Sequence, residues 1–262
     1  MSQMKTKWHP YPRYLLRKNA IISLLRKIDT RGMTALEFGY GSGDMLNEFG
    51  RMGMKVYGYD YSDDAKAIAL EIVNNSQYSK NIHLLSSEKQ ITKRKYDIIF
   101  AFEVLEHVED DYRILRKWKN LLKNDGRLII SVPAHLSDWN AADVFAGHFR
   151  RYERKNLISL LDDAGYEVDT FWNYGYPLTK VTDIMRNLVF KNRFKKVKLS
   201  VEGYTKVSGI KSKSTLITKL LYNNTVLKPF MIVQKLFFNT DLGNSYLVVA
   251  KVAKLKHRVI NY

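Results

Sequence analysis

A strand that ends in an acidic residue and a turn with three glycines constrains this chain more than any other feature. Glu37 is followed by Gly39, Gly41 and Gly43 at alternate positions, and Asp44 then begins a helical stretch. Glycine in such a turn lets the backbone take positive φ and lets a ligand approach without meeting a Cβ. The helix N-terminus beyond the turn offers unpaired N–H groups. The run therefore predicts a binding site for a nucleoside-containing cofactor.

The spacing of the glycines narrows the choice of ligand. A dinucleotide-binding turn has the pattern G-x-G-x-x-G, in which the third glycine lets the helix pack on the strand. In this chain Asp44 stands at the position of that third glycine. The spacing argues against a pyrophosphate ligand, and the alternative is a strand–helix turn that binds nothing.

Short apolar strands and helical stretches alternate along most of the chain. We expect strands at Met33–Phe38, Lys55–Tyr59, Ile82–Ser86, Tyr96–Phe102, Arg127–Val132, Tyr166–Trp172 and Ser245–Val252. We expect helices at Arg13–Ile28, Met45–Met52, Asp63–Asn75, Asp111–Leu122 and from about Glu153 to Ala164. Such alternation is typical of β-α-β units on a parallel sheet.

The chain is expected to form one domain with an insertion. Residues 1–30 would form an N-terminal cap helix, 31–173 the cofactor-binding core, 174–244 a basic helical insertion and 245–253 the final strand. Within the insertion, Val181–Phe190 and Leu216–Phe238 are amphipathic, the second with a break near Pro229. We expect a loop at Pro133–Arg151, and Lys123–Gly126 is interpreted as the stop signal of a helix.

The net charge of +17 is concentrated in the last third of the chain. From residue 175 onward the chain has 17 lysines and arginines but only three acidic residues, Asp183, Glu202 and Asp241, so this part has a net charge of +14. Such a field favours anionic partners, which are nucleic acid, an anionic membrane surface or a phosphate-bearing substrate; the alternative is a solvated lysine-rich surface.

Compartment signals are few. The chain has no cysteine, which excludes disulfides and thiolate metal sites and suits a reducing compartment. The first ten residues have no apolar core of a secretory signal, and no run of about 18 apolar residues exists. We expect a cytoplasmic protein, with peripheral contact at the inner membrane surface as an addition.

Glu37 and the three glycines resemble the first motif of the class I S-adenosylmethionine-dependent methyltransferases. The resemblance implies a Rossmann-like α/β fold with a seven-stranded, mostly parallel sheet whose last strand is antiparallel. It also implies S-adenosyl-L-methionine as cofactor. Asp60, which ends the second strand, can accept hydrogen bonds from both ribose hydroxyls. The remaining cofactor contacts that we expect are Tyr61, Ser87 or Glu88 near the adenine, and Phe102 lining the pocket.

The run from Tyr96 to Val108 is similar to the fourth-strand motif of the ubiquinone-pathway O-methyltransferases. It holds Glu103, Glu106 and His107, which would share one face of a helical turn. These residues could bind a divalent ion such as Mg²⁺, with His148 completing the site as in the related small-RNA 2′-O-methyltransferases. The alternatives are that the residues only brace the turn, or that His107 is a general base without metal.

The loop after the fifth strand carries the third resemblance, in Gly147–Tyr152. His148, Arg150 and Tyr152 would face the methyl acceptor, and His135 is a further candidate base. For Arg151 and Tyr152 the alternative is that they anchor the loop onto the sheet. The basic and aromatic start of the chain, including Arg13, resembles the helix that covers the cofactor in this group.

The histidines favour an oxygen acceptor, because a hydroxyl must lose a proton when it is methylated. We therefore expect O-methylation of a small molecule, a glycan or a lipid-linked intermediate. The alternatives are an RNA 2′-O-methyltransferase and a non-catalytic cofactor-binding partner protein.

Overall fold

The computed structural model describes residues 10–180, 182 and 224–254. Its strands are β1 (Thr34–Phe38), β2 (Lys55–Tyr59), β3 (Ile82–Leu85), β4 (Tyr96–Phe102), β5 (Leu122–Pro133), β6 (Tyr166–Tyr174) and β7 (Ser245–Val252). Its α-helices are α1 (Pro12–Leu25), α2 (Asp44–Arg51), α3 (Asp63–Asn74), α4 (Glu88–Ile91), α5 (Asp111–Lys119), α6 (Ala141–Ala146), α7 (Arg154–Asp163) and α11 (Asn224–Val233). Short 3₁₀ turns are η1 (Ser79–Asn81), η2 (Leu105–His107), η3 (Leu136–Asp138) and η4 (Gln234–Phe237).

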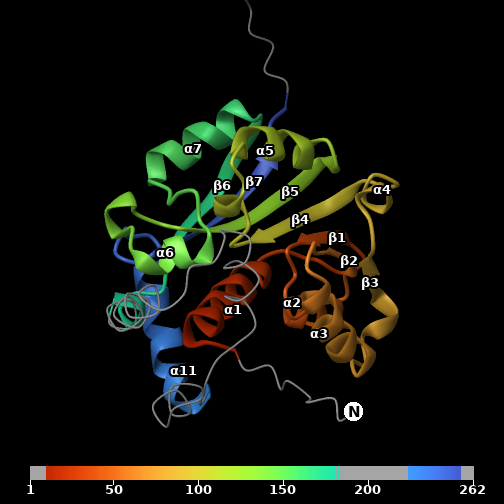
Figure 1. Cartoon of the computed structure of the whole chain (residues 1–262), viewed down its shortest axis with the longest axis horizontal. Coiled ribbons are helices and arrows are strands. Elements are labelled where there is room, and N and C mark those ends of the chain that lie inside the picture. The colour runs from red at the N-terminus through yellow and green to blue at the C-terminus, as the bar shows by residue number, and fades with distance from the viewer. Residues whose placement is uncertain (1–9, 181, 183–223, 255–262) are drawn as a thin grey trace, which may run out of the picture.

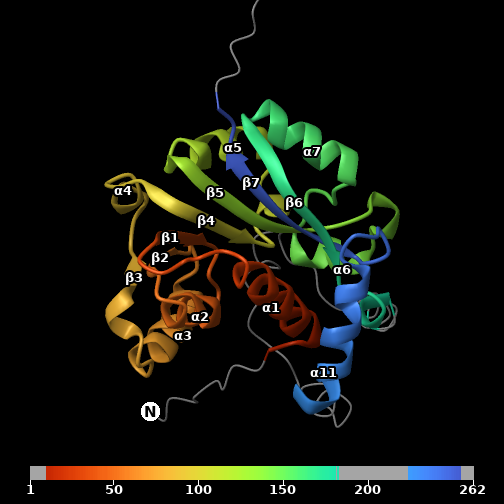
Figure 2. The same ribbon diagram turned by 180° about the vertical axis from the view of Figure 1, so that it is seen from behind.

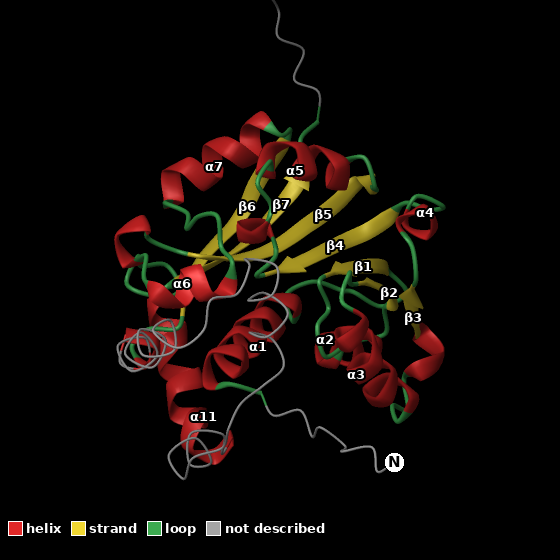
Figure 3. Ribbon diagram, in the orientation of Figure 1, coloured by secondary structure: helices red, strands yellow, loops and turns green. Residues whose placement is uncertain are grey.

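The described strands form one sheet in the order β3-β2-β1-β4-β5-β7-β6 (Figure 3). Strands β1 to β5 pair in parallel, whereas β7 runs antiparallel to both of its neighbours, β5 and β6. The expected Rossmann-like α/β fold with an antiparallel last strand is therefore confirmed.

Helices cover both faces of the sheet, as Figures 1 and 2 show. Successive strand residues point to opposite faces. In β1, Ala35 belongs to the apolar cluster under α1, α2 and α3, and Leu36 to the cluster under α5 and α7. Because both faces are buried, the central strands are almost wholly apolar, as parallel sheets require.

Strand β5 begins earlier than expected. Lys123–Gly126 is not a stop after a helix, because α5 ends at Lys119 and these four residues lie within β5. They form a bulge, because these four residues of β5 lie opposite a single residue of β4, Asp97. The flanking pairs are Tyr96–Leu122 and Ile98–Arg127. Lys123 closes the bulge by an ion pair of 2.8 Å with Asp97, whose carboxylate also accepts the Thr34 N–H.

The expected loop at Pro133–Arg151 contains a short helix, α6. Asn140 caps it by accepting the Ala142 N–H, and Asp143 accepts the Asn140 N–H in return, which completes a capping box. Gly147 ends the helix in the left-handed conformation, with φ of 76°.

The basic insertion at 174–244 falls largely outside the described residues, as does nearly all of Val181–Phe190. The break expected near Pro229 is wrong, because α11 continues through that residue. Proline removes one helical hydrogen bond; here Leu227 is fully buried against Leu15 and Leu16 of α1, and this packing supports the helix.

Gln234, in η4, ties the C-terminal part of the chain to α1. Its side chain is buried, donates to the Leu16 carbonyl at 3.1 Å and accepts the Gly175 N–H at 3.2 Å. One amide thus joins α1, η4 and the end of β6. Within the described ranges, no helix has the length and apolar character needed to cross a bilayer.

Candidate active site

The glycine turn lies at the carboxyl end of β1, at the centre of the sheet. Gly39, Gly41 and Gly43 all have positive φ, of 66°, 55° and 77°. A Cβ at Gly39 would lie 2.7 Å from Val104, whereas a Cβ at Gly41 would have no other atom within 4 Å. Gly39 is thus required by packing, and Gly41 presents bare backbone to open space where a ligand can approach.

Glu37 lies buried directly before this turn. Its side chain is only 3% exposed, and among the described residues its Oε2 atom has no hydrogen-bond partner. Burial raises the pKa of Glu37 to about 8, although Arg17 opposes the shift. A buried carboxyl group without a partner is costly unless a ligand supplies one, and the ammonium group of an amino acid would do so.

Asp60 lies at the carboxyl end of β2 and faces the same turn. Its two oxygens accept the N–H groups of Gly41 and Ser62, each at 2.9 Å. It does not cap α3, since Ser62 does so by accepting the Ala65 N–H. Asp60 therefore links the glycine turn to the loop after β2 and keeps lone pairs for a hydroxyl-bearing ligand.

The other expected cofactor residues surround this point. Tyr61 is 67% exposed, and Ser87 and Glu88 are exposed at the carboxyl end of β3. Phe102 ends β4, is 6% exposed and packs against Phe49 and Phe100. The positions of all four residues are compatible with the roles expected of them, which stay predictions.

Helix α1 covers the site with positive charge. Arg13 and Arg17 lie 3.5 Å and 3.8 Å from the Glu103 carboxylate. Lys18 donates to Asp44, at the start of α2, at 2.8 Å, and Tyr14 donates to the same carboxylate at 2.5 Å. The sequence pointed to Arg13 but not to Tyr14, Arg17 or Lys18, although Arg13 and Arg17, and likewise Tyr14 and Lys18, are spaced i, i+4 on an amphipathic helix.

Glu103 belongs to this charged layer. It has a φ of 55°, which is unusual for a residue other than glycine, and its side chain accepts hydrogen bonds from Ser131 and Tyr174 at 3.1 Å and 3.3 Å. Burial alone would raise the pKa of Glu103, but Arg13 and Arg17 hold it at about 2.

A second group of side chains lies beyond Glu103, on η2 and the loop after α6. One potential ligand atom from each of Glu106, His107 and His148 lies within 4.8 Å of the others. The two imidazole rings meet edge to face with their centroids 4.8 Å apart. The sequence predicted a group of Glu103, Glu106 and His107, with His148 as a candidate fourth member; the structure brings together Glu106, His107 and His148, without Glu103.

His107 is held as a neutral imidazole. Its Nδ1 atom lies 3.3 Å from the Gly147 carbonyl, which can only accept, so Nδ1 carries the proton and Nε2 is bare. Burial, helped by His148, lowers the pKa of His107 to about 4. A bare nitrogen in this setting can accept a proton or bind a metal.

Glu106 is fully buried, and neither of its carboxylate oxygens has a hydrogen-bond partner in the described part of the chain. Burial and the nearby Glu103 raise its pKa well above the usual range. Its Oε1 atom lies 3.9 Å from His148 Nε2. Such an orphaned carboxyl group beside two imidazoles fits a bound cation.

Glu103 and His135, which were also candidates, lie outside this group. The Glu103 carboxylate is engaged by α1, as described above. His135 Nε2 lies 2.9 Å from the Gly243 carbonyl, and its ring packs edge to face on Tyr246 at 5.7 Å. Its other ring nitrogen, Nδ1, lies 3.9 Å from Glu153. Both nitrogens of His135 thus have neighbours outside the group of Glu106, His107 and His148.

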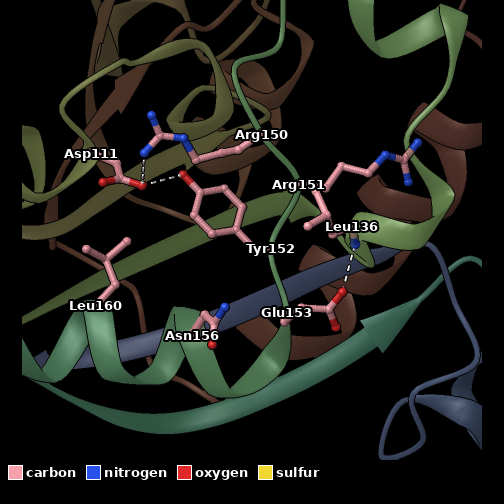
Figure 4. Close-up of a pocket in the computed structure, with 8 residues that line it drawn as sticks. All are labelled: Asp111, Leu136, Arg150, Arg151, Tyr152, Glu153, Asn156 and Leu160. Carbon is pink, nitrogen blue, oxygen red and sulfur yellow. Dashed lines mark hydrogen bonds and ion pairs between the residues drawn. The ribbon is translucent and has the colours of Figure 1, made fainter.

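Arg150 and Tyr152, expected to face the acceptor, line a separate surface pocket of about 270 Å³ together with Asp111 (Figure 4). Asp111 forms an ion pair with Arg150 at 2.5 Å and accepts from the Tyr152 hydroxyl at 3.1 Å. These contacts anchor the loop to the start of α5.

Comparisons with known proteins identify the family and the fold. A family model described as a methyltransferase domain matches residues 8–170. A ubiquinone biosynthesis O-methyltransferase of Glaesserella parasuis is 35% identical over 112 residues, which are 38% of this chain and 45% of that protein. One of Bradyrhizobium diazoefficiens is 29% identical over 100 residues, 38% of this chain and 40% of that protein. The chain thus spans less than half the length of these two relatives.

Solved structures show the same fold. An S-adenosylmethionine dependent methyltransferase of Mesorhizobium loti superimposes with a TM-score of 0.55 at 14% identity, covering 90% of this chain and 99% of that one. A magnesium protoporphyrin IX methyltransferase of Synechocystis with bound S-adenosylhomocysteine gives 0.52 at 13% identity, covering 91% and 84%.

Proposed function

This chain belongs to the methyltransferase domain family, the class I S-adenosylmethionine-dependent methyltransferases, and we propose that it methylates an oxygen atom of a small molecule, a glycan or a lipid-linked intermediate. One observation carries the proposal: His107, on η2 just after β4, has a bare imidazole nitrogen, and at the end of the neighbouring strand β1 the buried Glu37 carboxyl has an oxygen with no partner among the described residues. The names of the curated relatives, both O-methyltransferases, support the choice of oxygen.

The residues divide the work between donor and acceptor. When bound, S-adenosylmethionine supplies a methyl group on a positively charged sulfur. The acceptor oxygen would form the new bond to the methyl carbon while the carbon–sulfur bond breaks, and the sulfur would leave as a neutral thioether. Glu37 would bind the ammonium group and Asp60 the ribose hydroxyls. His107 Nε2 would take the proton of the acceptor hydroxyl, and α1 would exclude water.

Asp60 provides the main test. Replacing it by alanine removes a charged acceptor, a loss worth about 1.5–3 kcal/mol, so the Kd for S-adenosylhomocysteine should rise about 10- to 100-fold. Isothermal titration calorimetry measures it, with Asp64→Ala on the exposed face of α3 as the matched control. Failure of the intact protein to bind S-adenosylhomocysteine would overturn the proposed function; equal binding by Asp60→Ala would remove only the ribose role.

Glu37 predicts a pH dependence of cofactor binding. With a pKa of about 8 the free protein holds this proton at pH 7, whereas an ammonium group binds the ionised form. Affinity for S-adenosylhomocysteine should therefore increase as pH rises from about 6 to 8, approaching tenfold per unit, with a proton released on binding.

Calorimetry in two buffers of different ionisation enthalpy measures the released proton. Glu37→Gln should bind more weakly and lose the pH dependence. An affinity that is flat over this range in the unmodified protein, or an equal slope in Glu37→Gln, contradicts the assigned role.

We also propose an alternative use of the same atoms: Glu106, His107 and His148 can bind a divalent metal ion, which would then activate the acceptor hydroxyl in place of proton transfer to His107 Nε2. The set of two imidazoles and one carboxylate favours Mn²⁺ or Zn²⁺ over the Mg²⁺ expected from sequence, because Mg²⁺ prefers oxygen ligands. Glu106→Gln should weaken Mn²⁺ binding at least about tenfold, whereas Glu109→Gln, at an exposed position nearby, should not. If Mn²⁺ titration shows no binding to the unmodified protein, the acid–base role remains without a metal.

Peripheral contact with an anionic membrane is a further part of the proposal. On α11 and η4, Ile232 and Leu236 are 67% and 79% exposed, and Lys228 and Lys235 are exposed beside them. Such a combination is typical of interfacial helices. Cosedimentation with phosphatidylglycerol vesicles should be salt-sensitive and reduced by Ile232→Ser with Leu236→Ser, but not by Leu70→Ser on α3. Equal binding by all three proteins would contradict the assigned surface.

A further inference from the structure

Asp143, on α6, contacts His148 from the side opposite to Glu106. Its Oδ1 atom lies 3.0 Å from His148 Nδ1, and its backbone carbonyl accepts the His148 N–H, also at 3.0 Å. The other ring nitrogen, Nε2, is the one that lies 3.9 Å from Glu106 Oε1. The imidazole is thus held from its backbone and from one nitrogen, while the second nitrogen faces the candidate site.

Asp143 is itself fixed by a buried ion pair. It is 1% exposed, and its second oxygen, Oδ2, lies 3.0 Å from Arg151 and accepts the Asn140 N–H at 2.9 Å. Arg151 is 5% exposed and donates to the Ala134 carbonyl at 3.0 Å, at the end of β5. Burial of two charges is expensive, and such pairs are rarely a gain in stability alone. The sheet therefore determines, through Arg151, where the Asp143 carboxylate lies.

The two oxygens of Asp143 have separate tasks. Oδ2 completes the capping box of α6 and pairs with Arg151, so this oxygen alone makes the side-chain contacts of Asp143 that cap the helix. Oδ1 contacts His148. A carboxylate paired with a guanidinium can only accept, so the proton of a neutral His148 must lie on Nδ1.

We propose that Asp143, held by Arg151, is a positioning residue that keeps the His148 proton on Nδ1 and its bare Nε2 directed at Glu106 and His107. The inference rests on the proposed function, because the orientation of His148 Nε2 matters only if Glu106, His107 and His148 accept a proton or bind a metal during methyl transfer. It makes His148 the counterpart of His107, whose Nδ1 is fixed by the Gly147 carbonyl. Nδ1 of each imidazole thus faces a group that can only accept, and the two rings meet edge to face beside Glu106.

The arrangement predicts what Asp143→Asn does. Arg151 and the Asn140 N–H both donate, so the amide oxygen of the new residue would face them, and its NH₂ group would face His148. Nδ1 must then accept, and the proton moves to Nε2. The same change of tautomer explains the loss of activity when the aspartate of a serine protease triad becomes asparagine.

Two-dimensional ¹H–¹⁵N NMR at pH 8, on protein labelled with ¹⁵N-histidine, shows which ring nitrogen of His148 carries the proton. The His148 signals are assigned by their loss in His148→Gln. The unmodified protein should show a protonated Nδ1 and a bare Nε2, and Asp143→Asn should show the reverse. Asp138→Asn, the same substitution at a half-buried position on the neighbouring turn η3, should leave the signals unchanged. A protonated Nε2 in the unmodified protein overturns the proposal without any variant, and an unchanged tautomer in a folded Asp143→Asn does the same.

Two further measurements separate this proposal from the function on which it rests. Binding of S-adenosylhomocysteine should be unchanged in Asp143→Asn, because Asp143 lies outside the cofactor turn. With an acceptor found by screening labelled S-adenosylmethionine, Asp143→Asn should lower kcat about 10²- to 10⁴-fold with little change in KM. Absence of methyl transfer by the unmodified protein would count against the proposed function alone, since the tautomer result does not depend on the acceptor.

Discussion

The cost of burying carboxyl groups at the carboxyl ends of β1 and β4 shapes this whole region. Glu37, Glu103 and Glu106 lie there with little or no access to water, and each must be neutral or paired. Arg13 and Arg17 pair with Glu103, whereas Glu37 and Glu106 have raised pKa values and oxygens without a hydrogen-bond partner in the described part of the chain. Glu103 is thus a carboxylate paired by the chain itself, and Glu37 and Glu106 are the two groups for which we propose a ligand.

This charge balance explains why α1 is part of the site and not only a cover. Its apolar face packs on the sheet, while its cations reach Glu103 and Asp44. Cofactor binding must therefore be compatible with an existing set of ion pairs, since a positively charged ligand and the arginines of α1 act on the same acids.

The sequence predicted what is local and missed what depends on folding. Glu37, the glycines and Asp60 lie at strand ends within one β-α-β unit, so strand alternation alone brings them together. Asp143 and Arg151 were missed as functional residues because their relation to His148 depends on α6, which was expected to be a loop. The bulge at Lys123–Gly126 was misread because its partner Asp97 lies on another strand, and turn-forming residues do not tell a bulge from a helix end.

The position of β7 between β5 and β6 has a consequence for how the chain is made. β5 and β6 are synthesised well before β7, yet they do not pair with each other. Their facing edges keep unpaired N–H and C=O groups until residue 252 has left the ribosome, and such edges readily pair with other chains. The sheet can close only after synthesis of β7, so the fold of the core depends on the described strand that is synthesised latest.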